Sequence, residues 1–158
     1  MDSTKLQIRN ERPPIERFWD LFETTGWNLF FQATCEEYAR ALANSWLVVS
    51  AYNGKRLVGV GRVVTDGAIH AMIYDLIVHP DYQRRGIGSQ ILGILIEKCK
   101  EAKIHDIQLF CAPGKRAFYE KRHFAARPEE APGMQYVWWP KDSEIDNESS
   151  SGNIPADR

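Results

Sequence analysis

The spacing of apolar residues changes several times along the chain between the helical and the strand period. Apolar residues in 15–22 recur every three or four positions behind a Pro-Pro pair, which predicts a helix that ends near Gly26. Thr34 and Glu37 have the spacing of a capping box and predict the start of a second helix. A longer helix is predicted over 87–102, with one apolar face formed by Ile87, Ile91, Leu92, Leu95, Cys99 and Ala102.

Between the second and third helices the pattern becomes strand-like. Three predicted strands are separated by Asn-Gly and Asp-Gly pairs, which favour tight hairpin turns. The segment 27–32 is aromatic and has no clear period. The predicted strands are 4–9, 46–52, 56–65, 68–78, 106–111 and 135–139, with a further helix over 115–122.

These elements follow the order β-α-α-β-β-β-α-β-α-β, which predicts an α/β fold in one domain over residues 1–140. Residues 141–158 are polar and Ser-rich and are predicted to form a disordered tail.

Composition narrows the functional classes. The 158 residues are 44% hydrophobic and carry a net charge of −1, so no global field recruits nucleic acid or an anionic membrane. No apolar run is long enough to span a membrane, and no signal-peptide core is present, which together predict a cytoplasmic protein. Cys35, Cys99 and Cys111 lack metal-ligand spacing, so we expect reduced core thiols and no metal site.

The join between the strand ending at Val78 and the long helix carries the first candidate chemistry. The first turn of a helix presents unpaired N–H groups and the positive end of the helix dipole. Gly86 and Gly88 keep side chains away from these groups, and Arg84 and Arg85 add donors at the rim. The segment therefore predicts a phosphate cradle. It is neither a P-loop nor a complete Gly-x-Gly-x-x-Gly motif, and a bare Gly-x-Gly also occurs in ordinary strand–helix connections.

The whole string, Gln-x-x-Gly-x-Gly directly after Val-His-Pro-Asp-Tyr, resembles the acetyl-CoA pyrophosphate loop of the GCN5-related N-acetyltransferase (GNAT) superfamily. The predicted order of elements is also the superfamily's. The resemblance implies a mixed, mostly antiparallel sheet, splayed between its fourth and fifth strands by a bulge, with acetyl-CoA as cofactor. Its pantetheine arm would pair with the backbone of Leu76–Val78. The cofactor-binding residues implied are Leu76, Ile77, Val78, Gln83, Arg84, Arg85, Gly86, Ile87, Gly88, Ser89 and Phe118.

The resemblance also implies a general acid. The superfamily's Tyr pattern matches the segment 118–124, in which Tyr119 takes the role of proton donor to the leaving thiolate. A phenol with a pKa of about 10 is suited to a thiol of about 8.5. The alternative is that Tyr119 is only a core aromatic residue. The chain departs from the pattern at His123, where Gly is usual, and at Ala112, where a cofactor-binding Asn is usual.

Asp75 is the leading candidate for the general base because it lies in an otherwise apolar strand. A period of two places it on one face with Ile73 and Ile77, where burial would raise its pKa. The alternative is a carboxylate satisfied by backbone N–H groups at the bulge. His70 and His79 are weaker candidates, and His79 would contact cofactor or solvent from the turn.

A closer resemblance concerns the acceptor. Ile-Tyr-Asp-Leu-Ile-Val-x-Pro, Phe-Tyr-Glu-Lys and a late Gly-Met together resemble the plant and cyanobacterial arylalkylamine (serotonin-type) N-acetyltransferase branch. The segment 127–134 would cover the acceptor site, where Glu129 or Glu130 would attract an ammonium group unless both are ordinary solvated charges. The substrate-binding residues implied are Trp27, Phe30, Phe31, Tyr74 and Met134, although core packing also explains the aromatic residues at 27–31.

Together these patterns predict an acetyl-CoA-dependent N-acetyltransferase that acts on a small primary amine through a ternary complex. An arylalkylamine is the first acceptor, a polyamine or amino sugar the second, and a protein amine the third. The rival hypotheses are a non-catalytic acyl-CoA sensor on the same fold and a nucleotide-binding protein. Trp138 and Trp139 would permit a homodimer through the last strands.

Overall fold

The computed structural model describes residues 6–136. Two compact units divide the chain, residues 1–110 and residues 111–158. The first unit contains β1 (Leu6–Arg9), α1 (Ile15–Glu23), α2 (Asn28–Phe31), α3 (Cys35–Ala43), β2 (Leu47–Asn53), β3 (Arg56–Thr65), β4 (His70–Val78), the 3₁₀ turn η1 (Pro80–Tyr82), α4 (Ile87–Glu101) and β5 (Asp106–Leu109). The second contains α5 (Arg116–Glu120). The prediction of a single domain over 1–140 stays a prediction.

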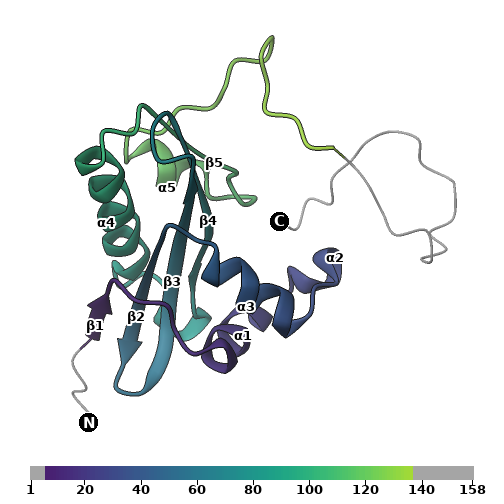
Figure 1. Ribbon diagram of the computed structural model, residues 1–158, viewed down its shortest axis with the longest axis vertical. Helices are drawn as coiled ribbons and strands as arrows, with labels where there is room; N and C mark the ends of the chain where they lie inside the picture. Colours follow the sequence, from purple (N-terminus) through teal and green to yellow (C-terminus); the bar gives the residue numbers. More distant parts are fainter. Residues whose placement is uncertain (1–5, 137–158) are drawn as a thin grey trace, which may run out of the picture. The chain divides into compact units, whose positions relative to one another are not determined.

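The five strands lie in one sheet in the order β1-β2-β3-β4-β5, which is also their order in the chain (Figure 1). The pairs β1–β2, β2–β3 and β3–β4 are antiparallel, and the pair β4–β5 is parallel. The predicted fold class, a mixed and mostly antiparallel sheet within an α/β chain, is therefore confirmed.

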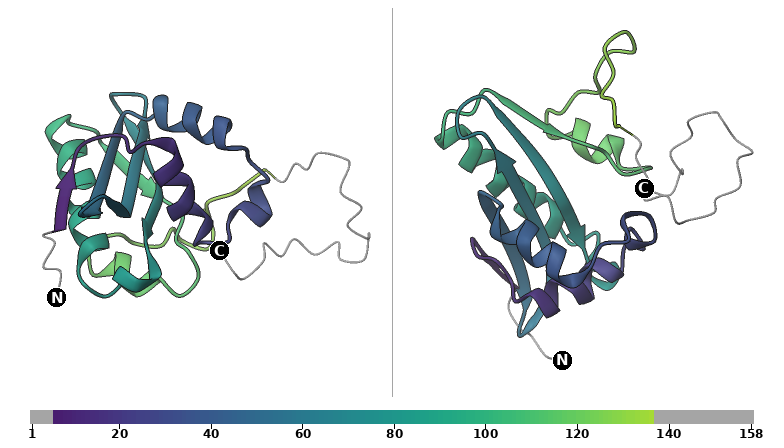
Figure 2. Two further views of the ribbon diagram at one scale, coloured as in Figure 1. Left: turned by 90° about the horizontal axis from the view of Figure 1, so that it is seen from below. Right: turned by 45° about the vertical axis from the view of Figure 1, so that its right-hand side comes forward.

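Helices cover both faces of the sheet. Figure 2 shows α4 on one face and α1 with α3 on the other. Phe18, Leu21 and Phe22 of α1 pack with Tyr38 and Leu42 of α3 in a buried cluster that also includes side chains of β2, β3 and β4. The apolar periodicity of these helices thus marks the faces that the sheet buries, as predicted.

Local capping explains where the first helices begin and end. The Thr34 hydroxyl accepts a hydrogen bond from the Glu37 N–H at 3.2 Å, and the Glu37 carboxylate accepts from the Thr34 N–H at 2.8 Å, which confirms the capping box. The short helix α2 was not predicted. It ends at Gln32 in the left-handed conformation (φ 51°), and the Asn28 amide oxygen accepts from the Ala33 N–H at 2.9 Å.

Two glycines of β3 bring α4 close to the sheet. A Cβ at Gly59 would lie 2.9 Å from Ile91 Cδ1, and a Cβ at Gly61 would lie 2.9 Å from both Ile91 Cγ2 and Leu95 Cδ1. The absence of side chains at these positions sets the distance between α4 and β3, and so positions the first turn of α4 next to the end of β4.

Several predicted boundaries and burials are corrected by the structure. The connection between β3 and β4 is four residues long instead of two, because the Asp66 carboxylate accepts hydrogen bonds from three N–H groups of the turn, which also lower its pKa. Ala102 is exposed at the C-cap of α4. Of the three cysteines only Cys99 is fully buried, whereas Cys35 is half-buried and Cys111 exposed.

The C-terminal predictions lie partly outside the described residues. Helix α5 is shorter than the predicted 115–122, and β5 ends at Leu109. Residues 135 and 136 are not in a strand, and the remainder of the predicted last strand, with Trp138 and Trp139, lies outside the described range, as does the predicted tail.

Candidate active site

The centre of the candidate site is a bulge in β4. The register between β3 and β4 shifts between Val60 and Arg62, and Asp75 takes the left-handed conformation with φ of 50°. The parallel pairing of β4 with β5 extends only from His70 to Ile73. Within the described range 6–136, no strand is paired with this edge of β4 beyond Ile73, so the backbone of 74–78 is left as an open edge next to β5. The splay implied by the resemblance is therefore present.

The bulge also changes which residues share a face. Ile77 pairs with Val60 and lies in the cluster of α1 and α3, whereas Ile73 pairs with Val63, which is two residues from the α4-facing Gly61. The prediction that Asp75 shares one face with both Ile73 and Ile77 is therefore wrong. A strict period of two fails here because the extra residue of the bulge reverses the alternation.

Asp75 has a charged partner that the sequence did not indicate. Its Oδ2 accepts a hydrogen bond from Arg62 Nε at 2.5 Å, and the two side chains are only 8% and 12% exposed. The guanidinium of Arg62 lies over the ring of Tyr74, 5.1 Å from the centroid. Among residues 6–136, the hydrogen-bond partner of the Asp75 carboxylate is thus the guanidinium of Arg62, whereas the alternative considered backbone N–H groups.

The turn after β4 is fixed by its own side chains and by side chains of the β2–β3 hairpin. The Gln83 amide donates to the Val78 carbonyl at 3.0 Å, and Asn53 Nδ2 donates to the Tyr82 hydroxyl at 3.1 Å. His79 bonds with Arg56 at 2.8 Å and accepts from the Asp81 N–H at 3.2 Å. These bonds make His79 a structural part of the turn, and its contact with cofactor or solvent stays a prediction.

The N-terminus of α4 has the features of an anion site. Gly86 is its N-cap with φ of 80°, and α4 has neither a side-chain cap nor an acidic residue in its first turn. Arg84 also has a positive φ, and both Arg84 and Arg85 are exposed. Arg85 donates to the Asp81 carbonyl at 2.8 Å and lies over the Tyr82 ring. The dipole and cations at this end of α4 would stabilise a bound diphosphate.

Tyr119 lies in the second unit and has an apolar environment. Its ring makes edge contacts with the rings of Phe118 and Phe124. Burial, and next the Cys111 thiolate, raise its pKa to about 12. The phenol therefore stays protonated at neutral pH, as a proton donor must.

The two departures from the Tyr pattern have different consequences. His123 has φ of 67°, the conformation that favours Gly, so the turn after α5 has the glycine-type geometry although a His stands there. Ala112 instead accepts the Lys115 N–H at its carbonyl at 3.1 Å in a turn, and its methyl side chain offers no hydrogen bond to a cofactor.

The predicted acceptor residues differ in exposure. Trp27 packs against the core cluster, as the alternative interpretation proposed. Phe31 and Tyr74 are 48% and 38% exposed, and Met134 of the second unit is 88% exposed. Phe31 and Tyr74 thus keep ring surface that a ligand could contact.

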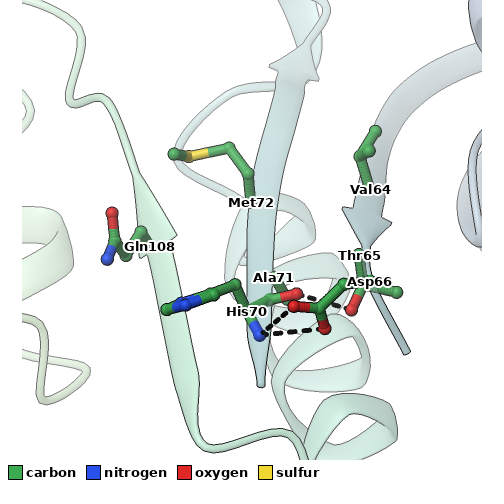
Figure 3. Close-up of a pocket in the computed structure, with 7 residues that line it drawn as sticks. All are labelled: Val64, Thr65, Asp66, His70, Ala71, Met72 and Gln108. Carbon is green, nitrogen blue, oxygen red and sulfur yellow. Dashed lines mark hydrogen bonds between the residues drawn. The ribbon is translucent and has the colours of Figure 1, made fainter. Parts of the chain in front are cut away.

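The sequence did not predict a hollow of about 240 Å³ at the start of β4, the end of the strand away from the phosphate-binding segment (Figure 3). His70 bonds there with Asp106 at 3.0 Å across the β4–β5 pair. His70 lies at the start of β4, whereas Asp75 and the segment 79–86, called here the phosphate turn, lie at or beyond the other end of the strand. His70 therefore does not belong to the candidate site. The hollow is lined by Val64, Thr65, Asp66, His70, Ala71, Met72 and Gln108.

Comparison with known proteins agrees with this geometry. The model of the Acetyltransferase (GNAT) family matches residues 8–124. The chain belongs to this family. It is 32% identical over 125 residues to the uncharacterized N-acetyltransferase ycf52 of Pyropia yezoensis, an alignment that covers 77% of this chain and 69% of that protein. It is also 32% identical to the histone acetyltransferase TAP1 of Glycine max, over 76% of this chain and 54% of that protein.

Solved GNAT-type structures have the same fold. A probable acetyltransferase from methicillin-resistant Staphylococcus aureus superposes with a TM-score of 0.75 at 24% identity, covering 85% of this chain and all of that one. A GNAT family protein from Streptococcus pneumoniae gives 0.68 at 27% identity, over 87% of this chain and all of that one. This GNAT chain is thus an acetyltransferase. Among its described residues no helix is both long and apolar enough to cross a membrane.

Proposed function

We propose that this GNAT chain transfers the acetyl group of acetyl-CoA to a small primary amine, with an arylalkylamine as the first acceptor. The observation that carries the proposal is the continuity of three features in one stretch. The open edge of β4 beyond Ile73 leads into the turn at 79–83, and this turn leads into the uncapped N-terminus of α4. An extended thioester arm and a diphosphate, in that order, are the groups that such a surface binds.

The residues present fit acetyl-CoA, the cofactor that GNAT enzymes generally use. The backbone of Leu76–Val78 would pair with the pantetheine arm, and the N–H groups of the first turn of α4 would bind the diphosphate. Gly86 has φ of 80°, and the nearest atom to an added Cβ there is Gln90 Nε2 at 3.9 Å, so no tightly packed group blocks the approach to these N–H groups. When bound, acetyl-CoA supplies an activated thioester. Ser89, Arg84, Arg85 and Phe118 are the further proposed cofactor contacts.

For the proton transfers, we assign the two predicted residues. Tyr119 would donate its phenolic proton to the departing thiolate, a role that its raised pKa of about 12 permits at neutral pH. Asp75 would accept the proton of the attacking amine, directly or through a water molecule. Arg62 donates to Oδ2 of this carboxylate, so Oδ1 is the oxygen that would act.

An aromatic acceptor is supported by the half-exposed rings of Phe31 and Tyr74, which offer flat apolar surface to an aryl group. Phe30, in edge contact with Phe31, would complete this wall, and Trp27 would support it from the core. In the second unit, exposed Met134 and the turn that contains Glu129 and Glu130 are proposed to cover the bound amine.

Protein-amine acetylation is the second candidate. The Glycine max relative at 32% identity is named a histone acetyltransferase, and this favours a lysine side chain over the polyamine and amino-sugar alternatives. A lysine ammonium and an arylalkylamine share a primary amine on an aliphatic stem, so the two acceptors must be separated by assay.

The test is thiol release from acetyl-CoA with tryptamine, serotonin, spermidine, glucosamine 6-phosphate and a lysine peptide as acceptors. Turnover with the two arylamines above the others supports the proposal, and preference for the peptide moves the acceptor to protein. Thermal stabilisation by acetyl-CoA without any turnover would favour the sensor. The variant Tyr119→Phe tests the assigned acid, because an enzyme that uses the phenol is expected to lose about a hundredfold in kcat without it.

The compartment and the oligomeric state also remain proposals. We infer an aqueous compartment, and the chloroplastic names of two Arabidopsis relatives add the stroma to the predicted cytoplasm. A fluorescent fusion of the full chain would distinguish these locations. The homodimer is tested by sedimentation of the purified chain.

A further inference from the structure

We propose that Arg62 is a positioning residue for Asp75. It holds the Asp75 carboxylate at the bulge of β4, on the face of the sheet that α1 and α3 cover. The inference rests on the proposed function, because it assigns to Arg62 a role in the proton transfer that Asp75 is proposed to carry out.

Arg62 is the only charged residue in the interior of β3, between Leu57 and Val64. It lies on the face of the sheet that α1 and α3 cover, and its side chain is 12% exposed. A guanidinium that is nearly excluded from water is costly unless it is paired and hydrogen-bonded. Its contacts therefore indicate why it stands there.

Those contacts come from β4 and from the end of α3. Nε donates to Asp75 Oδ2 at 2.5 Å, and Nη1 donates to the Ser45 hydroxyl at 3.4 Å. The Ser45 hydroxyl itself donates to the Ala41 carbonyl at 2.8 Å, so its oxygen is oriented to accept. The guanidinium carbon lies over the Tyr74 ring, 5.1 Å from its centroid. Arg62 thus connects Asp75 to the end of α3 and to a proposed acceptor-binding ring.

The backbone at Asp75 needs such support. A residue with a Cβ at φ of 50° is strained relative to the extended strand on either side, and such strain persists only where the surroundings fix it. The ion pair with Arg62 holds the Asp75 side chain, and it spans the register shift between β3 and β4. It therefore holds both the carboxylate and the bulge that opens the edge of β4.

Tyr38 of α3 is close enough to the pair to respond to its charges. Burial raises the pKa of Tyr38, the Asp75 carboxylate raises it further, and the Arg62 guanidinium lowers it. Tyr74 and Ser45 contact the guanidinium itself. Arg62 is the cation that is hydrogen-bonded to Asp75.

The test compares Arg62→Met, Arg62→Lys and Asp75→Asn by steady-state kinetics of the full chain. Asn tolerates the left-handed conformation well, so Asp75→Asn changes the carboxylate and spares the backbone. We expect Arg62→Met to lower kcat by about a hundredfold while the KM for acetyl-CoA stays within about twofold, and Arg62→Lys to recover at least about tenfold of that loss.

The double variant Arg62→Met with Asp75→Asn decides whether Arg62 acts through Asp75. If it does, Arg62→Met adds less than about a twofold loss in the Asp75→Asn background. An equal loss in both backgrounds, or an unchanged kcat in Arg62→Met, overturns the proposal. Thermal stabilisation by acetyl-CoA, measured for every variant, shows that the chain is folded and binds the cofactor. If Arg62→Met loses both kcat and the thermal stabilisation by acetyl-CoA, and Arg62→Lys recovers neither, Arg62 has a purely structural role and the proposal is overturned.

Arg9 provides the matched control. Its guanidinium also lies 5.1 Å from a tyrosine ring centroid, that of Tyr52, and is also paired with a carboxylate, that of Glu11 at 3.2 Å. This pair is about half exposed and lies on β1 and the segment that follows it. We expect Arg9→Met to leave kcat within about twofold. Failure of the proposed function itself is recognised separately, because the unmodified chain would then show no turnover with any amine.

Discussion

The close approach of α4 to β3 makes Gly61→Ala a sensitive probe of how the phosphate turn is positioned. A Cβ at this position would lie 2.9 Å from Ile91 Cγ2 and from Leu95 Cδ1, and 3.3 Å from Leu76 Cδ1. Contacts below 3.0 Å force these side chains or α4 to move. Overpacking of a core by one methyl group costs about 1–3 kcal/mol, and replacing a strand Gly recovers about 0.5–1 kcal/mol, so we expect a net loss of about 1–2 kcal/mol.

Thermal unfolding measures this loss. For a chain of this length the Tm is expected to fall by about 2–8 °C. Gly93→Ala is the matched control, because it makes the same chemical change in α4 itself at an exposed position with no atom within 4 Å of the added Cβ. A helical Gly→Ala change stabilises by about 0.5–1 kcal/mol, so the two variants should shift the Tm in opposite directions. A Gly61→Ala protein as stable as the unmodified chain would refute the packing argument.

Gly59 allows a finer test of which atom is crowded. The atom nearest its Cβ is Ile91 Cδ1 at 2.9 Å, whereas Gly61 meets Ile91 Cγ2. Ile91→Val removes Cδ1 and keeps a branched methyl. It should therefore relieve part of the destabilisation of Gly59→Ala and little of that of Gly61→Ala, a difference that double-mutant cycles of unfolding free energy resolve.

Three further predictions concern single residues. Gly86→Ala should destabilise the chain by about 1–2 kcal/mol in chemical denaturation, since φ of 80° penalises any Cβ, and should weaken acetyl-CoA binding in titration calorimetry; equal affinity would contradict the cradle. His123→Gly should stabilise by about 0.5–1 kcal/mol, because Gly adopts φ of 67° without strain, and a lower Tm would contradict this. The raised pKa of Tyr119, about 12, means that the unfolded chain loses the phenolic proton first, at about pH 10, so stability should decline as pH rises from about 10 toward 12. Tyr119→Phe should lack this part of the decline in Tm against pH.

The sequence was sufficient for the elements whose signals are local. The apolar faces of α1 and α4, the Thr34–Glu37 capping box and the Asn-Gly turn after β2 all depend on neighbours in the chain, and each is found where it was predicted. The glycine-bearing entry to α4 is also local, because both the N-cap conformation and the N–H groups of the first turn belong to one short segment.

The bulge at Asp75 and its partner Arg62 depend on register, which the sequence does not display. Alternation along β4 predicts one face for Ile73, Asp75 and Ile77, and nothing in that pattern marks an extra residue. Arg62 lies 13 positions away and becomes a neighbour only through the pairing of β3 with β4. His123 could be predicted in part. The pattern shows that His stands where Gly is usual, but only the backbone shows that the residue has the positive φ that favours Gly.

The coincidence of strand order in the sheet with strand order in the chain has a consequence for how the protein folds. β3 and β4 each pair with the strand synthesised just before them through a short turn, so these three central strands, β2 to β4, form from contacts that are close in sequence. The two outer pairs instead close loops that contain helices: α1 to α3 lie between β1 and β2, and α4 lies between β4 and β5. Loop closure is the slower event where contacts are distant in sequence. We therefore expect hydrogen exchange during refolding to protect the amides of β2 and β3 before those of β1 and β5, so that the edge of β4 forms before β5 pairs with it.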